Sequence, residues 1–193
     1  MTEMLSNFSH YTVPTLPHLL ALIGHITTIF PPVDTSIIVV DSISTLIDIA
    51  YPRNADERPT SKRNENGRFF GNRRQAVIGE LASKLAKLAA MRNIAILVTS
   101  NTTTKIRSEG AAVLRPAISG QDWDNAMATR ILLFRDWAPD LDSRVDKPPP
   151  GHQSARFAGV MKTGGLSLAG KSDIGSVVAF EIEEVSMAPG HHQ

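Results

Sequence analysis

Two short apolar runs, each followed by polar residues, constrain the fold more than any other feature of this sequence. Residues 37–42 read Ile-Ile-Val-Val-Asp-Ser, and residues 94–99 read Ile-Ala-Ile-Leu-Val-Thr. Four consecutive β-branched residues predict a strand that is buried on both faces, which is typical of parallel sheets. Because a helical pattern separates the two runs, we expect a βαβ unit with parallel strands and a right-handed crossover.

The remaining elements follow from the spacing of apolar residues. Helices are predicted at residues 17–30 and 75–91, where apolar side chains recur every three or four positions. The other expected elements are a helical turn at 123–129 and strands at 131–134, 156–161 and 177–185. The last two strands are expected to pair across a glycine-rich loop. The prediction is one α/β domain over residues 1–193, with a central, mostly parallel sheet, flanking helices and a carboxyl-terminal antiparallel hairpin.

Composition excludes several classes of protein. The chain has no cysteine, which excludes a disulfide scaffold, an iron–sulfur cluster, a cysteine-ligated zinc site and a cysteine nucleophile. Apolar residues make up 42% of the chain, which is enough for a packed core. The longest apolar stretch, Leu19 to Phe30, is well short of the roughly 20 residues that a membrane helix needs. We therefore expect no membrane association.

Positive charge is local, because the whole chain has a net charge of only +1. Residues 51–74 have a net charge of +4, and residues 101–120 have a net charge of +2. Both segments have few apolar residues, so we predict flexible basic loops that neutralise phosphates without reading sequence. The candidate DNA-binding residues are Arg53, Arg58, Lys62, Arg63, Arg68, Arg73, Arg74, Lys105, Arg107 and Arg115. The alternative is that both segments are ordinary solvated loops. Residues 136–155, rich in Pro and Asp, are predicted to form an exposed linker.

The acid that ends the first apolar run is the main chemical signal. Ligands collect at the carboxyl ends of parallel strands, where Asp41 and Ser42 are expected to lie. In P-loop ATPases an acid at this position holds the water shell of Mg²⁺. The alternative is that Asp41 merely begins a turn, as Asp often does.

The order of these features resembles the carboxyl-terminal half of the RecA-like recombinase core, in its eukaryotic form and its recombination-repair paralogues. The resemblance runs from about Ile37 to Val185 and includes the strand ending Thr99-Ser100-Asn101, the segment Pro116–Gly120 and the segment 128–133. It implies a partial RecA-like P-loop ATPase core with ATP and Mg²⁺ as cofactors. By resemblance, Asp41 serves Mg²⁺, Asp41 and Ser42 lie beside the nucleotide, and Asn101 occupies the position that senses the γ-phosphate. The family usually has Gln there, and Asn is one methylene shorter. The two basic loops correspond to the loops that touch DNA.

Parts of that core have no counterpart in this sequence. The 36 residues before Ile37 contain neither a glycine-rich phosphate-binding loop nor the glutamate that activates water in the family. Residues 165–172 match the pattern G-x-x-x-x-G-K-[ST] letter for letter, but an alternating strand pattern follows them instead of a helix. A working phosphate loop needs that helix. We therefore predict a hairpin loop at 165–172 and weak or absent ATPase activity from this chain alone.

Three functions remain open from the sequence. The favoured one, by resemblance, is a nuclear recombinase paralogue in homologous recombination and DNA repair, which binds ATP, single-stranded DNA and recombinase or paralogue subunits. The second is a non-enzymatic interaction module that binds a recombinase partner through an open sheet edge. The third is an unrelated nucleotide-binding α/β protein.

Overall fold

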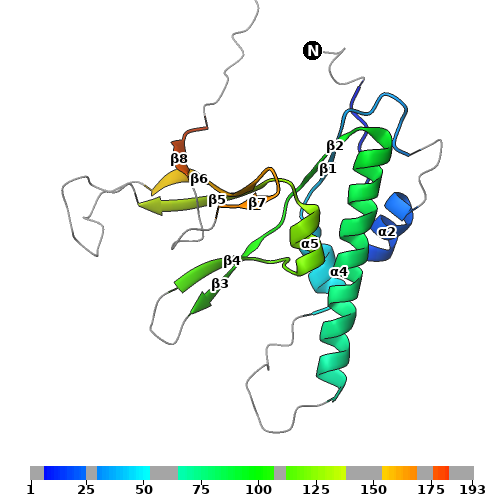
Figure 1. Ribbon diagram of the computed structural model, residues 1–193, viewed down its shortest axis with the longest axis horizontal. Coiled ribbons are helices and arrows are strands. Elements are labelled where there is room, and N and C mark those ends of the chain that lie inside the picture. The colour runs from blue at the N-terminus through cyan, green and yellow to red at the C-terminus, as the bar shows by residue number, and fades with distance from the viewer. Residues whose placement is uncertain are drawn as a thin grey trace, which may run out of the picture. The chain divides into compact units, whose positions relative to one another are not determined.

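The computed structural model describes residues 7–24, 30–52, 65–106, 112–137, 154–168 and 176–182 (Figure 1). It divides the chain into two compact units, Met1–Ala126 and Met127–Gln193, where the sequence predicts one domain. The two units are described separately below. Helices and strands both occur, so the chain has an α/β fold.

Strands β1 (Ile37–Val40) and β2 (Ala95–Val98) form a parallel pair, as the apolar runs predict. Ile37 lies opposite Ala95, and Val40 lies opposite Val98, with no register shift. The described strands fall into three separate sheets, so the wider parallel sheet predicted from the sequence is not confirmed. The parallel pair is what places the carboxyl ends of β1 and β2 at one edge.

One face of the β1–β2 pair is exposed, whereas the sequence predicts burial on both faces. The exposed fractions are 56% for Ile37, 55% for Val39 and 52% for Leu97. The alternating residues of the same strands are half-buried. The prediction was wrong because a strand is covered on both faces only when layers of the fold flank it on both sides, and composition does not report that.

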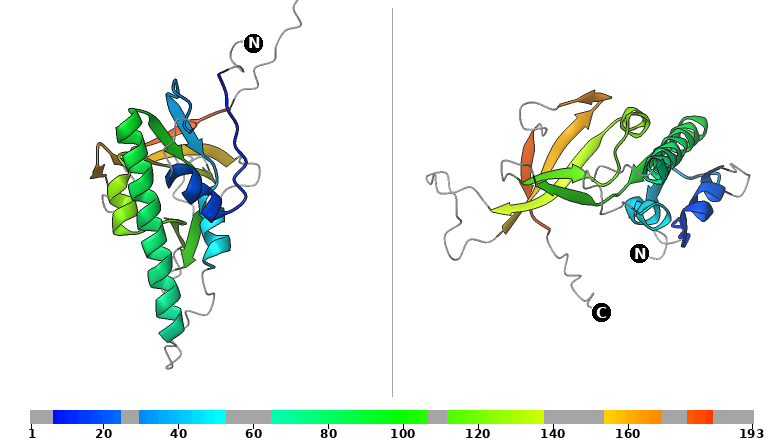
Figure 2. Two further views of the ribbon diagram at one scale, coloured as in Figure 1. Left: turned by 90° about the vertical axis from the view of Figure 1, so that its right-hand side faces the viewer. Right: turned by 90° about the horizontal axis from the view of Figure 1, so that it is seen from below.

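The core of the first unit lies among its helices. These are α2 (Leu16–Gly24), α3 (Ile43–Ala50), α4 (Glu65–Arg92) and α5 (Gln121–Ala126) (Figure 2). Helix α4 has a buried stripe spaced three and four residues apart, and each member is at most 3% exposed: Ile78, Leu81, Leu85 and Leu88. Helices α2 and α3 add buried apolar side chains to the same core, among them Leu19, Ile23, Ile43 and Ile47.

Helix α4 begins at Glu65, ten residues before the predicted start, so the loop predicted at 51–74 is wrong for residues 65–74. The polar sequence of this first part hides the helical period, and contacts made by Arg74 with α3 stabilise it. Residues 53–64 of the predicted loop lie outside the described residues. The helix ends at Arg92, and the left-handed backbone of the next residue, Asn93 (φ 51°), allows the amide of Ile94 to donate to the carbonyl of Ala89.

The second predicted loop also contains regular structure. Strands β3 (Thr102–Ile106) and β4 (Ala112–Pro116) pair antiparallel, with Thr103 opposite Arg115 and Lys105 opposite Val113. The prediction of a flexible loop over 101–120 was therefore wrong for these strands. Three consecutive threonines, which suit a pleated strand, open β3. The sequence interpretation gave more weight to the charge and polarity of the segment than to these threonines, and so predicted a loop.

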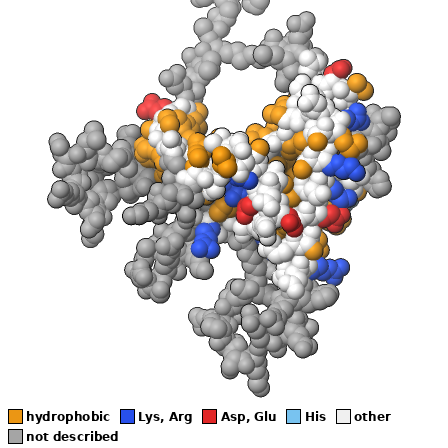
Figure 3. Space-filling model, viewed as in Figure 1, with side chains coloured by type: hydrophobic (Ala, Val, Ile, Leu, Met, Phe, Trp, Pro, Cys, Tyr) orange, Lys and Arg blue, Asp and Glu red, His pale blue; other side chains and the backbone are white. Residues whose placement is uncertain are grey.

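The second unit is an antiparallel sheet of β5 (Arg130–Trp137), β6 (Ser154–Thr163), β7 (Leu166–Ser167) and β8 (Val177–Phe180). Strand β6 pairs with β5 and with both β7 and β8. The antiparallel pairing of β6 with β8 agrees with the predicted carboxyl-terminal hairpin. On one side of this sheet the rings of Phe134 and Phe157 stack, with centroids 5.5 Å apart. Figure 3 shows hydrophobic side chains at the surface over this sheet.

The predicted linker at 136–155 is shorter than expected, because its two ends continue β5 and β6. Residues 138–153 lie outside the described residues. Within the described part of the chain, no helix is both long enough and apolar enough to cross a membrane.

Candidate functional site

The parallel pairing brings Asp41 and Thr99 together at the carboxyl edge of β1 and β2. The hydroxyl of Thr99 donates to Asp41 Oδ1 at 2.5 Å, although the two residues are 58 positions apart. The backbone amide of Thr99 also donates to the carbonyl of Val40 at 3.0 Å, which extends the ladder by one residue. Both Asp41 and Thr99 remain exposed, so a carboxylate with a fixed orientation faces solvent at this edge.

Ser42 turns the chain out of β1 and into α3. Its backbone is left-handed (φ 55°, ψ 37°), a conformation that costs an L-residue roughly 1–2 kcal/mol. Three hydrogen bonds hold the turn: Ser42 N donates to Thr99 Oγ1 at 2.8 Å, Ile43 N donates to the Thr99 carbonyl at 3.1 Å, and Ser42 Oγ donates to Asp41 Oδ1 at 3.3 Å. Thr99 is therefore the residue on which this turn depends.

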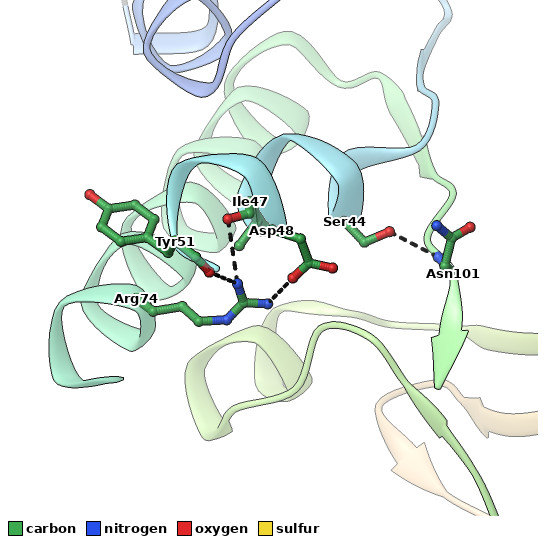
Figure 4. Close-up of polar contacts among 6 residues, drawn as sticks. All are labelled: Ser44, Ile47, Asp48, Tyr51, Arg74 and Asn101. Carbon is green, nitrogen blue, oxygen red and sulfur yellow. Dashed lines mark hydrogen bonds and ion pairs between the residues drawn. The ribbon is translucent and has the colours of Figure 1, made fainter. Parts of the chain in front are cut away.

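Asn101 is fixed to the same edge through its backbone. Its amide donates to Ser44 Oγ at 3.0 Å, and Ser44 is completely buried in the first turn of α3 (Figure 4). The side chain of Asn101 is exposed. The structure thus places the two predicted nucleotide-side positions, Asp41 and Asn101, after neighbouring parallel strands and at one end of the sheet.

The oxygen atoms at this edge suit a magnesium ion that also has water or phosphate ligands better than a metal ion held by protein side chains alone. One carboxylate and two hydroxyls are oxygen ligands, which Mg²⁺ prefers, and Mg²⁺ usually keeps waters and phosphates in its shell. Among the described residues, no group of three or more His, Cys, Asp or Glu side chains could hold a metal ion. Asp41 is therefore one oxygen donor at this edge, and the described residues beside it do not complete a metal site.

Arg74, a predicted DNA-binding residue, is bonded to the end of α3 (Figure 4). Its Nη1 donates to the carbonyls of Tyr51 at 2.7 Å and Ile47 at 3.4 Å, and its Nη2 pairs with Asp48 Oδ1 at 2.7 Å. Its side chain is 12% exposed. The Tyr51 carbonyl follows the last turn of α3 and gains a partner from Arg74, whereas the Ile47 carbonyl already accepts from the backbone amide of Tyr51. Arg74 joins α4 to α3 and has few donors left for a phosphate.

The other predicted DNA-binding residues are not gathered into one described cluster. Arg73 and Arg115 are exposed, on α4 and β4. Arg68 is in α4 and Lys105 is in β3, and their side chains are not among those described. The rest lie outside the described residues: Arg53, Arg58, Lys62, Arg63 and Arg107.

Sequence reasoning missed Thr99 and Ser44. Thr99 was assigned to the end of a strand, and the signal that could have identified it is the parallel register, which sets it beside Asp41. Ser44 belongs to α3, a helix that was not predicted although Ile43 and Ile47 are four residues apart.

The segment with the phosphate-loop pattern begins as a hairpin. Gly164 and Gly165 have positive φ (55° and 80°), and Leu166–Ser167 form β7, which pairs with β6. The amide of Gly165 donates to the carbonyl of Ala128 at 3.0 Å. A turn followed by a strand occupies residues 165–167, and residues 169–175 lie outside the described residues. The described part therefore agrees with the predicted hairpin loop.

Comparison with known proteins gives one informative similarity. No protein-family model matches the chain. The chain is 24% identical to the DNA repair protein rhp55 of Schizosaccharomyces pombe, over an alignment that is 199 positions long with its gaps. The alignment covers 83% of this chain and 56% of that protein, so the chain spans little more than half the length of its relative. Most of this chain is thus distantly similar to part of a DNA repair protein.

Proposed function

We propose that this chain belongs to a nuclear recombinase paralogue of the RecA-like type, acting in homologous recombination and DNA repair. The observation that carries the proposal is the bond between Thr99 and Asp41, which joins two parallel strands at their carboxyl edge. The similarity to a DNA repair protein over 83% of the chain supports it independently.

In this proposal Asp41 orients the water shell of an Mg²⁺ ion that is itself bound to ATP phosphates. The ion would supply charge neutralisation at the phosphates. Thr99 and Ser42 fix the orientation of the carboxylate, and Asn101 lies at the same edge as a second polar group. Because a single carboxylate cannot bind Mg-ATP, other groups must bind the phosphates. We therefore expect little or no ATP binding or hydrolysis by the 193-residue chain alone.

The proposed DNA contacts are the exposed cations whose side chains make no structural bond to another described residue. Arg115 on the β3–β4 hairpin and Arg73 on α4 meet that condition, and Arg74 does not. Binding through phosphates alone would be insensitive to base sequence and would weaken steeply with salt.

Fluorescence anisotropy with a labelled single-stranded oligonucleotide tests this part of the proposal. Affinity should fall with rising salt, and Arg115→Ala and Arg73→Ala should each reduce the slope of log K against log salt by about 0.7. Lys87→Ala is the matched control, since Lys87 is an exposed cation roughly 21 Å further along α4 from Arg73. Salt-independent binding, or equal effects of all three variants, would contradict the proposal.

A second candidate function rests on the exposed face of β1 and β2. Ile37, Val39 and Leu97 are each more than half exposed on a two-stranded parallel pair, and such pairs are normally covered on both faces. A non-enzymatic module that binds a recombinase would use this face as its docking surface. Here the similarity to a DNA repair protein suggests the class of partner.

The two candidate functions predict different effects of a substitution at Val39. Val39→Asp should abolish co-elution of the chain with a recombinase in size-exclusion chromatography if the face is the docking surface. Val33→Asp is the control, because Val33 is 83% exposed and precedes β1 in a turn. Absence of a complex, together with salt-dependent DNA binding, would favour the first function.

A further inference from the structure

The antiparallel sheet of the second unit has one apolar face that the described residues leave exposed. Within β5, Leu132 is 8% exposed, whereas its neighbours Ile131 and Leu133 are 57% and 65% exposed. Successive side chains of a strand point to opposite faces of the sheet, so this alternation separates a covered face from an exposed one. Antiparallel sheets often leave one face in water, but that face is normally polar.

The strand register shows which residues share the exposed face. Leu133 lies opposite Ala158 of β6, and Ala158 lies opposite Val178 of β8, which is 63% exposed. Ile131 lies opposite Val160 in the next row of the sheet. Because directly opposite residues in an antiparallel sheet point to the same side, these apolar side chains form one surface across three strands, called the sheet patch below. Figure 3 shows hydrophobic side chains at the surface over this sheet.

Two arginines lie at one end of the sheet patch. Arg135 lies opposite Arg156, in the row that follows Leu133 along β5. Like charges that lie directly opposite each other destabilise a sheet. Neither guanidinium group makes an ion pair or a hydrogen bond with another described residue. A negative charge bound beside these two side chains would therefore relieve their repulsion, next to an apolar surface of the kind that marks interaction sites.

We infer that the sheet patch docks an amphipathic helix of a partner protein, with an acidic side chain of that helix bound by Arg135 and Arg156. Three strands about 4.8 Å apart give a surface roughly 10 Å wide, which matches the diameter of one helix. A partner strand would pair with the edge of a sheet instead of lying on its face. Guanidinium groups favour a carboxylate by paired hydrogen bonds as well as by charge.

The register also sets the residue pattern that such a helix needs. Ile131 and Arg135 are four positions apart on β5, which is about 13 Å along a strand. A helix covers that length in about eight or nine residues. The acid should therefore follow the first apolar side chain by about two turns, with a second apolar side chain one turn after the first. The sheet patch uses none of the residues proposed for nucleotide or DNA, so its failure would leave that proposal intact.

Fluorescence anisotropy of the 193-residue chain with a labelled peptide tests the inference. The probe is an alanine-based helical peptide of about 16 residues, with leucines one turn apart and a glutamate two turns from the first leucine. Matched peptides have glutamine or lysine in place of the glutamate. The glutamate peptide should bind about tenfold more tightly than the glutamine peptide, because charge-assisted hydrogen bonds are the stronger ones. The lysine peptide should bind more weakly still. Absence of binding, or equal binding of the glutamate and glutamine peptides, would overturn the inference.

Adjacent residues of β8 provide a matched pair of variants. Val178→Asn, on the sheet patch, should weaken binding of the glutamate peptide about tenfold. Val177→Asn, at a 47% exposed position on the opposite face, should bind it as the parent does. Arg135→Glu should reverse the charge preference, so that the lysine peptide binds more tightly than the glutamate peptide. Lys87→Glu makes the same change of charge at an exposed position on α4 and should leave the preference unchanged.

Other occupants of the sheet patch would give different results, and each would overturn the inference. A parent dimer that Val178→Asn converts to a monomer in light scattering would assign the patch to a second copy of the chain. A single-stranded oligonucleotide that displaces the glutamate peptide, and that Arg135→Glu no longer binds, would assign the arginines to nucleic acid. A lower free energy of unfolding for Val178→Asn than for Val177→Asn, measured in urea, would show that the chain itself covers this face.

Discussion

The hydroxyl of Thr99 donates to the carboxylate of Asp41 across the ends of two parallel strands, and it accepts from the amide of Ser42. One threonine side chain therefore bonds both the acid at the strand end and the turn into α3. This relationship orients Asp41 independently of any ligand. Because these hydrogen bonds also stabilise the fold, their loss can be measured as a change in the free energy of unfolding.

Replacing Thr99 by valine should lower the free energy of unfolding by about 1–2 kcal/mol, because the amide of Ser42 and the carboxylate of Asp41 each lose a partner while shape is kept. Urea unfolding measures the change. Thr104→Val, at an exposed position on β3, should change stability by less than about 0.5 kcal/mol. A double-mutant cycle with Asp41→Ala should show coupling, and additive effects would contradict the proposed bond.

Arg74→Lys separates a structural role from a DNA-binding role. Lysine keeps the charge but lacks the fork that reaches Tyr51, Ile47 and Asp48 together, so stability should fall by about 1–2 kcal/mol. Arg73→Lys, at the neighbouring exposed position, should be close to neutral. If Arg74→Lys leaves the urea midpoint unchanged, the link between α4 and α3 does not contribute to stability.

The Ser42→Gly variant should be at least as stable as the parent protein, and the Ser42→Val variant should be less stable than both. Glycine adopts φ 55° without strain, at the cost of a more flexible unfolded chain and the bond to Asp41. Valine adds a β-branched side chain in a left-handed conformation and should cost about 2 kcal/mol. Thermal unfolding of the three proteins gives the order. A stable valine variant would show that the turn relaxes to another conformation.

Lys171→Ala should leave nucleotide binding unchanged, at whatever level the chain shows. The pattern that contains Lys171 starts as a turn at Gly165 and a short strand, Leu166–Ser167, that pairs with β6, whereas a phosphate loop leaves its backbone amides free to face the phosphates. Isothermal titration with Mg-ATP measures this for the parent and the variant. Loss of binding in Lys171→Ala alone would show that the hairpin contains a phosphate site after all.

The parallel pairing of β1 and β2 could be predicted from the sequence because it depends on local signals. β-Branched residues favour strands, and an intervening helix forces a crossover to a parallel partner. The register of that pair then follows from where each apolar run ends. The position of Asp41 at the carboxyl edge of the pair was predictable for the same reason, and the structure places Asn101 at the same end.

The first part of α4 and the β3–β4 hairpin could not be predicted in the same way. Residues 65–74 and β3 are mostly polar or charged, and β4, although it contains Val113 and Leu114, is too short to show a clear period. Residues 65–74 become helical in a context where Arg74 bonds to the end of α3, and β3 forms its ladder with β4 across residues 107–111. The first depends on a contact with the end of α3, 23 positions away in the chain, whereas the hairpin pairs neighbouring segments.

The sequence by itself determined the parallel strand pair, the buried stripe of α4 and the acid at the end of β1, because residue types and their spacing over a few positions are enough to predict each one. Only the tertiary structure decided that Thr99 orients Asp41, that Arg74 joins two helices, and that one face of β1 and β2 is exposed. The physical reason is that hydrogen-bond partners and burial depend on which segments meet in space. Local pattern sets what a segment can form but not what lies against it.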